Sequence, residues 1–173
     1  MGIAITLRQY LDTHGVPYDC VEHVPTNTSV GSAQTSHVPT DDLAKAVVLK
    51  RRDGYIMAIV PASRQVALEE VGGWLRQTIG LATEQEITTL FPDCIKGAVP
   101  PIAAAYGLHS LVDESLEGRN DIYFEAGDHR TLVHLSGEQF HKIMAKVPHG
   151  RISSGNAPND DMTGGDELYY SGA

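Results

Sequence analysis

The chain has 173 residues, of which 42% are hydrophobic and 20% charged, values typical of one globular domain with a sizeable core. Its 13 basic and 22 acidic side chains give a formal net charge of −9, which argues against a broad nucleic-acid-binding surface. No apolar run approaches the roughly 20 residues of a membrane-spanning helix, and the N-terminus lacks a signal-peptide pattern. We therefore expect a soluble, cytoplasmic protein that makes no membrane contact.

The two cysteines, Cys20 and Cys94, are far apart and have no CxxC partner. A disulfide framework and a structural zinc site are therefore not expected, and both thiols are interpreted as buried apolar groups. Residues 151–173 are rich in Gly, Ser, Asn and Asp, which indicates an acidic C-terminal tail outside the fold. The predicted organisation is one domain over residues 1–150, followed by this tail.

The first third of the domain shows clear helix and hairpin signals. Thr6-x-x-Gln9 has the pattern of a capping box, which predicts the start of a helix, and Gly15 with Pro17 ends it. Two β-rich segments meet at Asp53-Gly54, where the glycine suits a tight hairpin turn. The expected elements are a strand at 18–23, a helix at 30–37 and the hairpin strands at 46–51 and 55–60.

The remainder of the domain again alternates between helix and strand patterns. Thr83-x-x-Glu86 and Ser136-x-x-Gln139 predict two further capped helices, and prolines at both ends make residues 92–101 a loop. Other expected elements are a helix at 66–78 and strands at 110–113, 121–125 and 130–135. Strands that pair through hairpins between helices favour an α+β fold over a doubly wound parallel sheet.

Common signatures of cofactor and metal sites are missing from the sequence. It contains no GxGxxG, Walker, HExxH or GxSxG motif, and no two of its eight histidines stand four residues apart on one predicted helix. We therefore expect neither a metal site nor a cofactor. The basic cluster Lys50-Arg51-Arg52 is interpreted as a solvated strand end.

Two features remain as candidates for chemistry. Lys45 opens an apolar strand, where it is either an ordinary edge lysine or a cationic group that faces a substrate. The loop from Gly97 to Pro101 is either a plain crossover or a segment whose backbone N–H groups bind an oxyanion, because glycine allows close approach of the backbone. The patterns alone leave both choices open.

An ordered set of short motifs resembles the YbaK/ProX family of free-standing aminoacyl-tRNA deacylases, which are related to the editing domain of prolyl-tRNA synthetase. The resemblance extends from about residue 5 to about residue 147. It is carried by Glu22-His23 and the Thr/Ser loop after it, Lys45, Gly97-x-x-x-Pro101, Val112-Asp113 and Ala126-Gly127-x-His129.

The resemblance implies a curved, partly barrel-like mixed sheet flanked by helices, with a pocket between the sheet and the Gly97 loop. It implies hydrolysis of mischarged aminoacyl-tRNA, with an aminoacyl-tRNA synthetase as a possible partner and a homodimer as a possible assembly. The catalytic groups expected are Lys45 and the backbone N–H groups of Gly97 and Ala98. The substrate-binding residues expected are His23, Thr28, Pro101, Asp113 and His129.

The chain departs from the family pattern directly after the lysine, where Ala46 stands in place of the usual Thr or Ser. Ala103, Ala104 and Ala105 also replace the bulkier or glycine-containing sequence that is common after Pro101. These changes leave open which amino acid is removed from the tRNA. They also keep an alternative, a non-catalytic sensor module of the same fold that binds a nucleotide, an amino acid or a protein. A metal-dependent hydrolase is a more distant third possibility.

Overall fold

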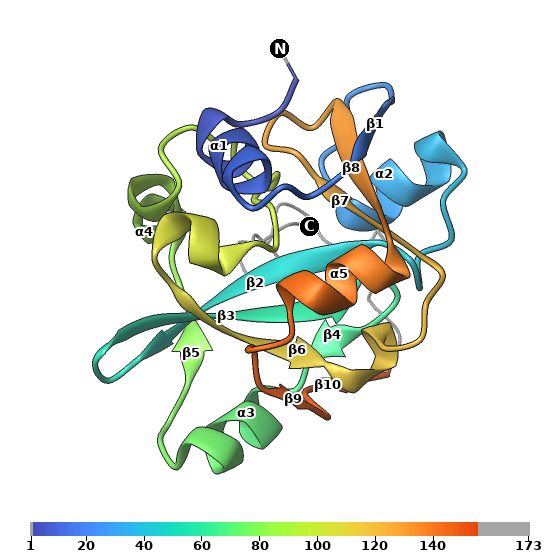
Figure 1. The fold of residues 1–173 in the computed structure, drawn as a ribbon. Coiled ribbons are helices and arrows are strands. Elements are labelled where there is room, and N and C mark those ends of the chain that lie inside the picture. The colour runs from blue at the N-terminus through green and yellow to red at the C-terminus, as the bar shows by residue number, and fades with distance from the viewer. Residues whose placement is uncertain (1, 156–173) are drawn as a thin grey trace.

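The computed structural model describes residues 2–155, which fold into an α+β domain, as the sequence predicts (Figure 1). The helices are α1 (Ile5–Thr13), α2 (Ser29–Ser36), α3 (Leu68–Leu75), α4 (Glu84–Leu90) and α5 (Gly137–Ile143), with 3-10 helices η1 (Ala103–Tyr106) and η2 (Glu114–Leu116). The strands are β1 (Asp19–Glu22), β2 (Ala44–Arg51), β3 (Gly54–Pro61), β4 (Gln65–Val66), β5 (Gly80–Leu81), β6 (His109–Asp113), β7 (Asp121–Glu125), β8 (Thr131–Ser136), β9 (His149–Gly150) and β10 (Ser153–Ser154).

The strands form three sheets. A five-stranded mixed sheet has the order β5-β2-β3-β6-β9, a three-stranded antiparallel sheet has the order β1-β8-β7, and β10 pairs with β4. The predicted hairpin is confirmed as β2 and β3, which pair from Ala44↔Pro61 to Arg51↔Gly54. The two larger sheets meet at one parallel bridge, Leu43↔Tyr123, so the strands of residues 2–155 form no closed barrel.

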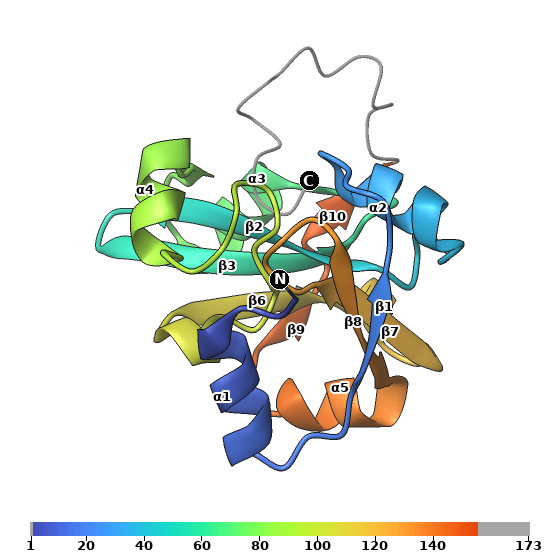
Figure 2. The same cartoon turned by 90° about the horizontal axis from the view of Figure 1, so that it is seen from above.

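The central hairpin is apolar on both faces because each face covers a separate core. Alternate residues of β2 and β3 point to opposite sides, as they must in a strand. One side packs with Leu7 and Leu11 of α1 and Phe140 of α5, and the other packs with Val71 of α3. Figure 2 shows α1 and α5 on one side of this sheet. Burial on both sides explains why β2 reads as a continuous apolar run.

Two of the three predicted helix caps are confirmed. Thr83 and Ser136 accept hydrogen bonds from the backbone N–H groups of Glu86 and Gln139. The capping box at Thr6 is wrong, because α1 begins at Ile5, after Ala4. The N–H of Thr6 instead donates to Oδ2 of Asp93 over 2.8 Å, so a distant carboxylate satisfies the free N–H at the start of this helix.

The fold continues past residue 150, so the predicted start of the tail at residue 151 is too early. Ile152 is fully buried, its N–H donates to Oδ1 of Asp113 over 2.9 Å, and β10 pairs with β4. The rest of the predicted tail, 156–173, lies outside the described residues. No helix within residues 2–155 is long and apolar enough to cross a membrane.

The two cysteines are free thiols, but the prediction that both are buried is wrong. Cys20 is exposed on β1, and Cys94 is half-buried in the loop after α4. Tyr106 and Cys94 share a hydrogen-bond contact of 3.3 Å between Oη and Sγ. Burial raises the pKa of the Cys94 thiol to about 12, which leaves it protonated and unreactive at neutral pH.

Candidate functional site

Lys45 lies inside the domain instead of at a sheet edge. Lys45 pairs with Val60 of β3 on one side, the bridge Leu43↔Tyr123 lies two residues before it on β2, and the residue is only 7% exposed. Burial lowers the pKa of the ammonium group from 10.5 to about 8. The side chain of Lys45 makes no hydrogen bond or ion pair with any residue in the described part of the chain. A solvated edge lysine would be exposed along its side chain, so the edge-lysine interpretation does not account for this burial.

The loop at Gly97 is tied to the turn between β7 and β8. Gly97 has a φ of 83°, which a residue with a side chain rarely adopts, and the N–H of Ile95 donates to the carbonyl oxygen of Gly127 over 2.7 Å. The N–H of Ala98 donates to the carbonyl oxygen of Ile95 over 3.0 Å. Ala98 therefore has no free N–H for an oxyanion. Among residues 2–155, the N–H of Gly97 has no such partner.

His129 makes a second connection to this loop. Its Nε2 lies in hydrogen-bond contact with the carbonyl oxygen of Lys96, and because a carbonyl only accepts, Nε2 carries the proton. Nδ1 is then an acceptor, and it is buried without a partner in residues 2–155. Burial is the main cause that lowers the pKa of His129, and the nearby His23 lowers it further. The imidazole is therefore neutral near pH 7.

His23 lies beside His129, as the prediction of a shared site requires. Its backbone N–H donates to the carbonyl oxygen of Arg130 over 2.7 Å, and its Nδ1 donates to that of Val24 over the same distance. The remaining ring nitrogen, Nε2, is buried and has no partner in the described part of the chain. The structure thus places His23, His129 and the Gly97 loop together, with one open acceptor nitrogen on each imidazole.

The other predicted substrate-binding residues serve the fold. Oγ1 of Thr28 caps α2 by accepting from the N–H of Gly31 over 2.9 Å. Oδ1 of Asp113 accepts from Ile152 N–H, and Oδ2 accepts from Ser115 N–H over 3.2 Å. Pro101 is buried just before η1. No hydrogen bond within residues 2–155 connects Asp113 or Pro101 to the two histidines.

Sequence reasoning missed Glu125, the last residue of β7, which is only 3% exposed. Oε1 of this carboxyl accepts from the hydroxyl of Ser32 over 2.5 Å, whereas Oε2 is buried without a partner in residues 2–155. Burial raises the pKa of Glu125 to about 7, the nearby Asp128 raises it further, and the bond from Ser32 opposes both. The available signal was a glutamate directly before the Ala126-Gly127-x-His129 motif.

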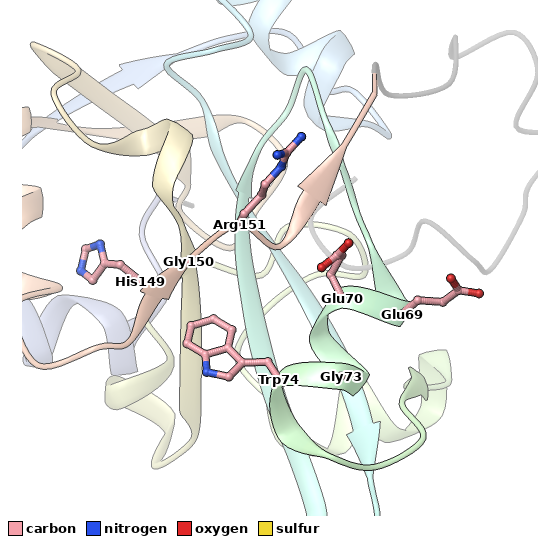
Figure 3. A pocket seen from close by; sticks show the side chains of 7 residues that line it. All are labelled: Glu69, Glu70, Gly73, Trp74, His149, Gly150 and Arg151. Atoms are coloured by element: carbon pink, nitrogen blue, oxygen red, sulfur yellow. The ribbon is translucent and has the colours of Figure 1, made fainter.

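A separate hollow of about 570 Å³ lies between α3 and β9 (Figure 3). Its lining includes Glu69, Glu70, Trp74, His149 and Arg151, and none of the predicted site residues. This hollow is therefore not the predicted pocket between the sheet and the Gly97 loop.

The described part of the chain contains no group of three or more His, Cys, Asp or Glu side chains that could hold a metal ion. The expected absence of a metal and of a cofactor remains a prediction.

Comparison with known proteins points to one family. The family model of the aminoacyl-tRNA editing domain matches residues 23–143, a range that contains Lys45, the Gly97 loop and both histidines of the site. No curated protein matches the chain at a significant level.

Solved structures share the fold. A candidate trans-editing enzyme for prolyl-tRNA synthetase superposes with a TM-score of 0.76 at 20% identity, covering 88% of this chain and 97% of its own. A hypothetical protein, APE2540, superposes with a TM-score of 0.76 at 18% identity, covering 86% of this chain and 99% of its own. A candidate signal transduction protein from Marinobacter aquaeolei VT8 superposes with a TM-score of 0.71 at 17% identity, covering 86% of this chain but only 30% of its own. At these identities the likeness concerns the fold.

Proposed function

Since the chain belongs to the aminoacyl-tRNA editing domain family, we propose that it hydrolyses the ester bond of a mischarged aminoacyl-tRNA. The observation that carries the proposal is Lys45, an unpaired lysine buried inside the matched region. Burial lowers the pKa of Lys45 because it disfavours the charged form, and groups with perturbed pKa values concentrate at functional sites. In the proposed complex, oxygen atoms of the substrate supply the hydrogen-bond acceptors that this lysine lacks.

The proposed reaction needs no protein nucleophile because the aminoacyl ester is already activated. Water attacks the carbonyl carbon, the tetrahedral intermediate collapses, and the products are the free amino acid and the 3′-hydroxyl of the terminal ribose. The neighbouring 2′-hydroxyl of that ribose activates the water. The protein positions the ester and stabilises the oxyanion.

Lys45 and Gly97 supply the positive potential in this scheme. With a pKa of about 8, Lys45 is mostly an ammonium at pH 7, and it binds the ester carbonyl oxygen or the terminal phosphate. The N–H of Gly97 donates to the oxyanion, and it does so without the N–H of Ala98, which the Ile95 carbonyl already occupies.

Editing requires a second selection step because one methylene gives a synthetase only about 1 to 3 kcal/mol of discrimination. The substrate-binding part of the site is proposed to be His23 and His129, whose open ring nitrogens accept hydrogen bonds. Ala46 lacks the hydroxyl of the Thr or Ser that is usual at this position, so the family pattern does not identify the preferred amino acid. The assay below measures it. We propose action in trans in the cytoplasm, with a synthetase as a partner and a homodimer as the assembly.

The test is deacylation of a panel of mischarged tRNAs by the purified protein and by Lys45→Ala, in the presence of a strong chelator. We expect the wild-type protein to release amino acid from at least one tRNA, and a folded Lys45→Ala variant to lose this activity. Full activity in Lys45→Ala would remove the proposed role of the lysine. Binding of aminoacyl-tRNA without turnover by the wild type would support the sensor module instead.

A further inference from the structure

Two buried groups of opposite charge, Lys45 and Glu125, lie on adjacent strands and do not pair with each other. Leu43 and Tyr123 form the bridge between β2 and β7, and the N–H of Tyr123 donates to the carbonyl oxygen of Asp42 over 2.9 Å. Both strands run in the same direction from this bridge. Lys45 and Glu125 are each two residues beyond it, and no ion pair joins them.

The alternation of strand side chains places Lys45 on the side of β2 that carries Leu43 and Val47, and Glu125 on the side of β7 that carries Tyr123. Leu43 and Tyr123 pack in one cluster with Ala33 of α2, and residues two positions along a strand point to the same side. For Glu125 the bond from Ser32, also on α2, confirms this direction. Glu125 therefore lies under α2, and Lys45 follows Leu43, whose side chain packs in the cluster of that helix.

The hydrogen bonds around Glu125 satisfy one carboxyl oxygen and leave the other open. Ser32 donates to Oε1, and the hydroxyl of Thr26 lies 2.6 Å from that of Ser32, so a row of hydroxyl groups supports this oxygen. Oε2 has no donor in residues 2–155, although it is buried. The Oγ of Ser29, one turn before Ser32 on the same face of α2, is also buried without a partner. A buried polar atom without a partner calls for an explanation, and a ligand that supplies the partner is the one tested below.

We propose that Oε2 of Glu125 accepts a hydrogen bond from the α-ammonium group of the aminoacyl moiety, and that the site therefore selects aminoacyl groups with a free amine. The inference rests on the proposed function, since it names the part of that substrate which Glu125 recognises. Ser32 fixes the carboxylate through Oε1, and Oε2 is then a directional acceptor for a cation. Its raised pKa in the empty site fits a group whose counter-charge arrives with the substrate.

The division of charge in the site follows from this assignment. Lys45 attracts the electron-rich end of the ester, and Glu125 attracts the cationic end, so the two groups fix the orientation of the carbonyl between them. An N-acylated or peptidyl ester lacks the ammonium and leaves Glu125 without a partner. A site with a buried acceptor rejects such a ligand more strongly than a merely apolar site does.

Binding of uncleavable analogues tests the assignment without relying on turnover. The probes are 3′-aminoacylamino-3′-deoxyadenosines that carry each amino acid of the deacylation panel, together with matched analogues in which hydrogen replaces the α-amine. We expect the wild-type protein to bind the amine-bearing probe at least about tenfold more tightly than its matched analogue, the scale of a hydrogen bond to a charged group. Equal affinity for the two would overturn the proposal.

The variant Glu125→Gln retains the size of the side chain and removes its charge. We expect it to bind the amine-bearing probe about tenfold more weakly, so that the preference disappears, while affinity for the amine-free analogue stays within about twofold. Glu69→Gln, an exposed carboxylate on α3, is the matched control and should retain the preference. A Glu125→Gln protein that still prefers the free amine would assign Glu125 a structural role alone.

Lys45→Ala separates this proposal from the proposed function. We expect it to lose turnover and to retain the preference for the free amine, because that preference belongs to Glu125. If the wild type deacylates tRNA but shows no amine preference, the Glu125 assignment fails and the deacylase assignment stands. If the wild type prefers the free amine but does not deacylate any tRNA, the Glu125 assignment stands and the deacylase assignment fails.

Discussion

His129 donates a hydrogen bond from Nε2 to the carbonyl oxygen of Lys96, and through it the turn between β7 and β8 holds the loop that contains Gly97. His129 itself has a φ of 59°, in the left-handed region that asparagine tolerates better than most residues. The asparagine side chain is too short to contact the Lys96 carbonyl, so His129→Asn removes this hydrogen bond with little change in backbone strain.

For His129→Asn we expect kcat to fall about tenfold, the value of one hydrogen bond that positions a catalytic loop. The thermal midpoint should change little, since Asp128 continues to hold the turn by accepting from the N–H groups of Arg130 and Thr131. Steady-state deacylation kinetics and a thermal melt measure both quantities. A large loss of stability together with unchanged kcat would make His129 a fold residue.

Lys45 should lower the stability of the protein at neutral pH. Its pKa in the fold, about 8, is below 10.5, so the unfolded chain holds this proton more tightly and stability rises as pH increases from about 8 to 10.5. The difference corresponds to about 3 kcal/mol below pH 8. We expect Lys45→Met to raise the unfolding free energy at pH 7 while it abolishes turnover. Denaturant unfolding at pH 7 and pH 10 measures the gain, which should be smaller at pH 10.

The exposed Lys50, which pairs with Glu86 over 3.0 Å, gives the matched control for this experiment. Lys50→Met removes a lysine from the same strand without changing a buried charge. If both methionine variants gain equally at pH 7, hydrophobicity and not the burial of charge explains the effect.

The pH dependence of turnover distinguishes two roles of Lys45. If its ammonium form stabilises the oxyanion, kcat falls as pH rises through about 8, because the cation is lost there. If its neutral amine acts as a base, kcat rises over the same interval. We expect the fall, after subtraction of the spontaneous hydrolysis of the ester. A Lys45→Arg variant, which stays charged, should retain what activity it has above pH 8.

Local sequence patterns predicted the elements that local interactions determine. The β2–β3 hairpin was predicted because Asp53-Gly54 marks the turn and the strands on both sides are apolar. The two confirmed caps, at Thr83 and Ser136, bind an N–H only three residues away. The two-residue strands β4, β5, β9 and β10 were missed, since two residues are too few to show any alternation.

The missed parts of the site depend on contacts between residues far apart in the sequence. The cap of α1 comes from Asp93, and Ser32 approaches Glu125 only in the folded chain. The occupied N–H of Ala98 is a local exception, since its acceptor, Ile95, is three residues away. The family resemblance named His23, His129 and the Gly97 loop, which lie together in the fold, and their roles in the site stay predictions. It did not show that Lys45 is buried, because a lysine at a strand start is usually exposed.

Gly97 is the position at which a substitution should separate turnover from binding. Its φ of 83° and its N–H, which has no hydrogen-bond partner in residues 2–155, make it the proposed oxyanion donor. In Gly97→Val, a β-branched side chain is strained at this φ and lies where the ester approaches. We expect kcat to fall on the order of 100-fold, the scale of one lost oxyanion donor, whereas affinity for the uncleavable aminoacyl-adenosine falls less.

Gly107→Val, with a φ of 71° and open space around it, controls for backbone strain alone and should retain turnover. Equal loss of rate and affinity in Gly97→Val would take the oxyanion role away from this loop.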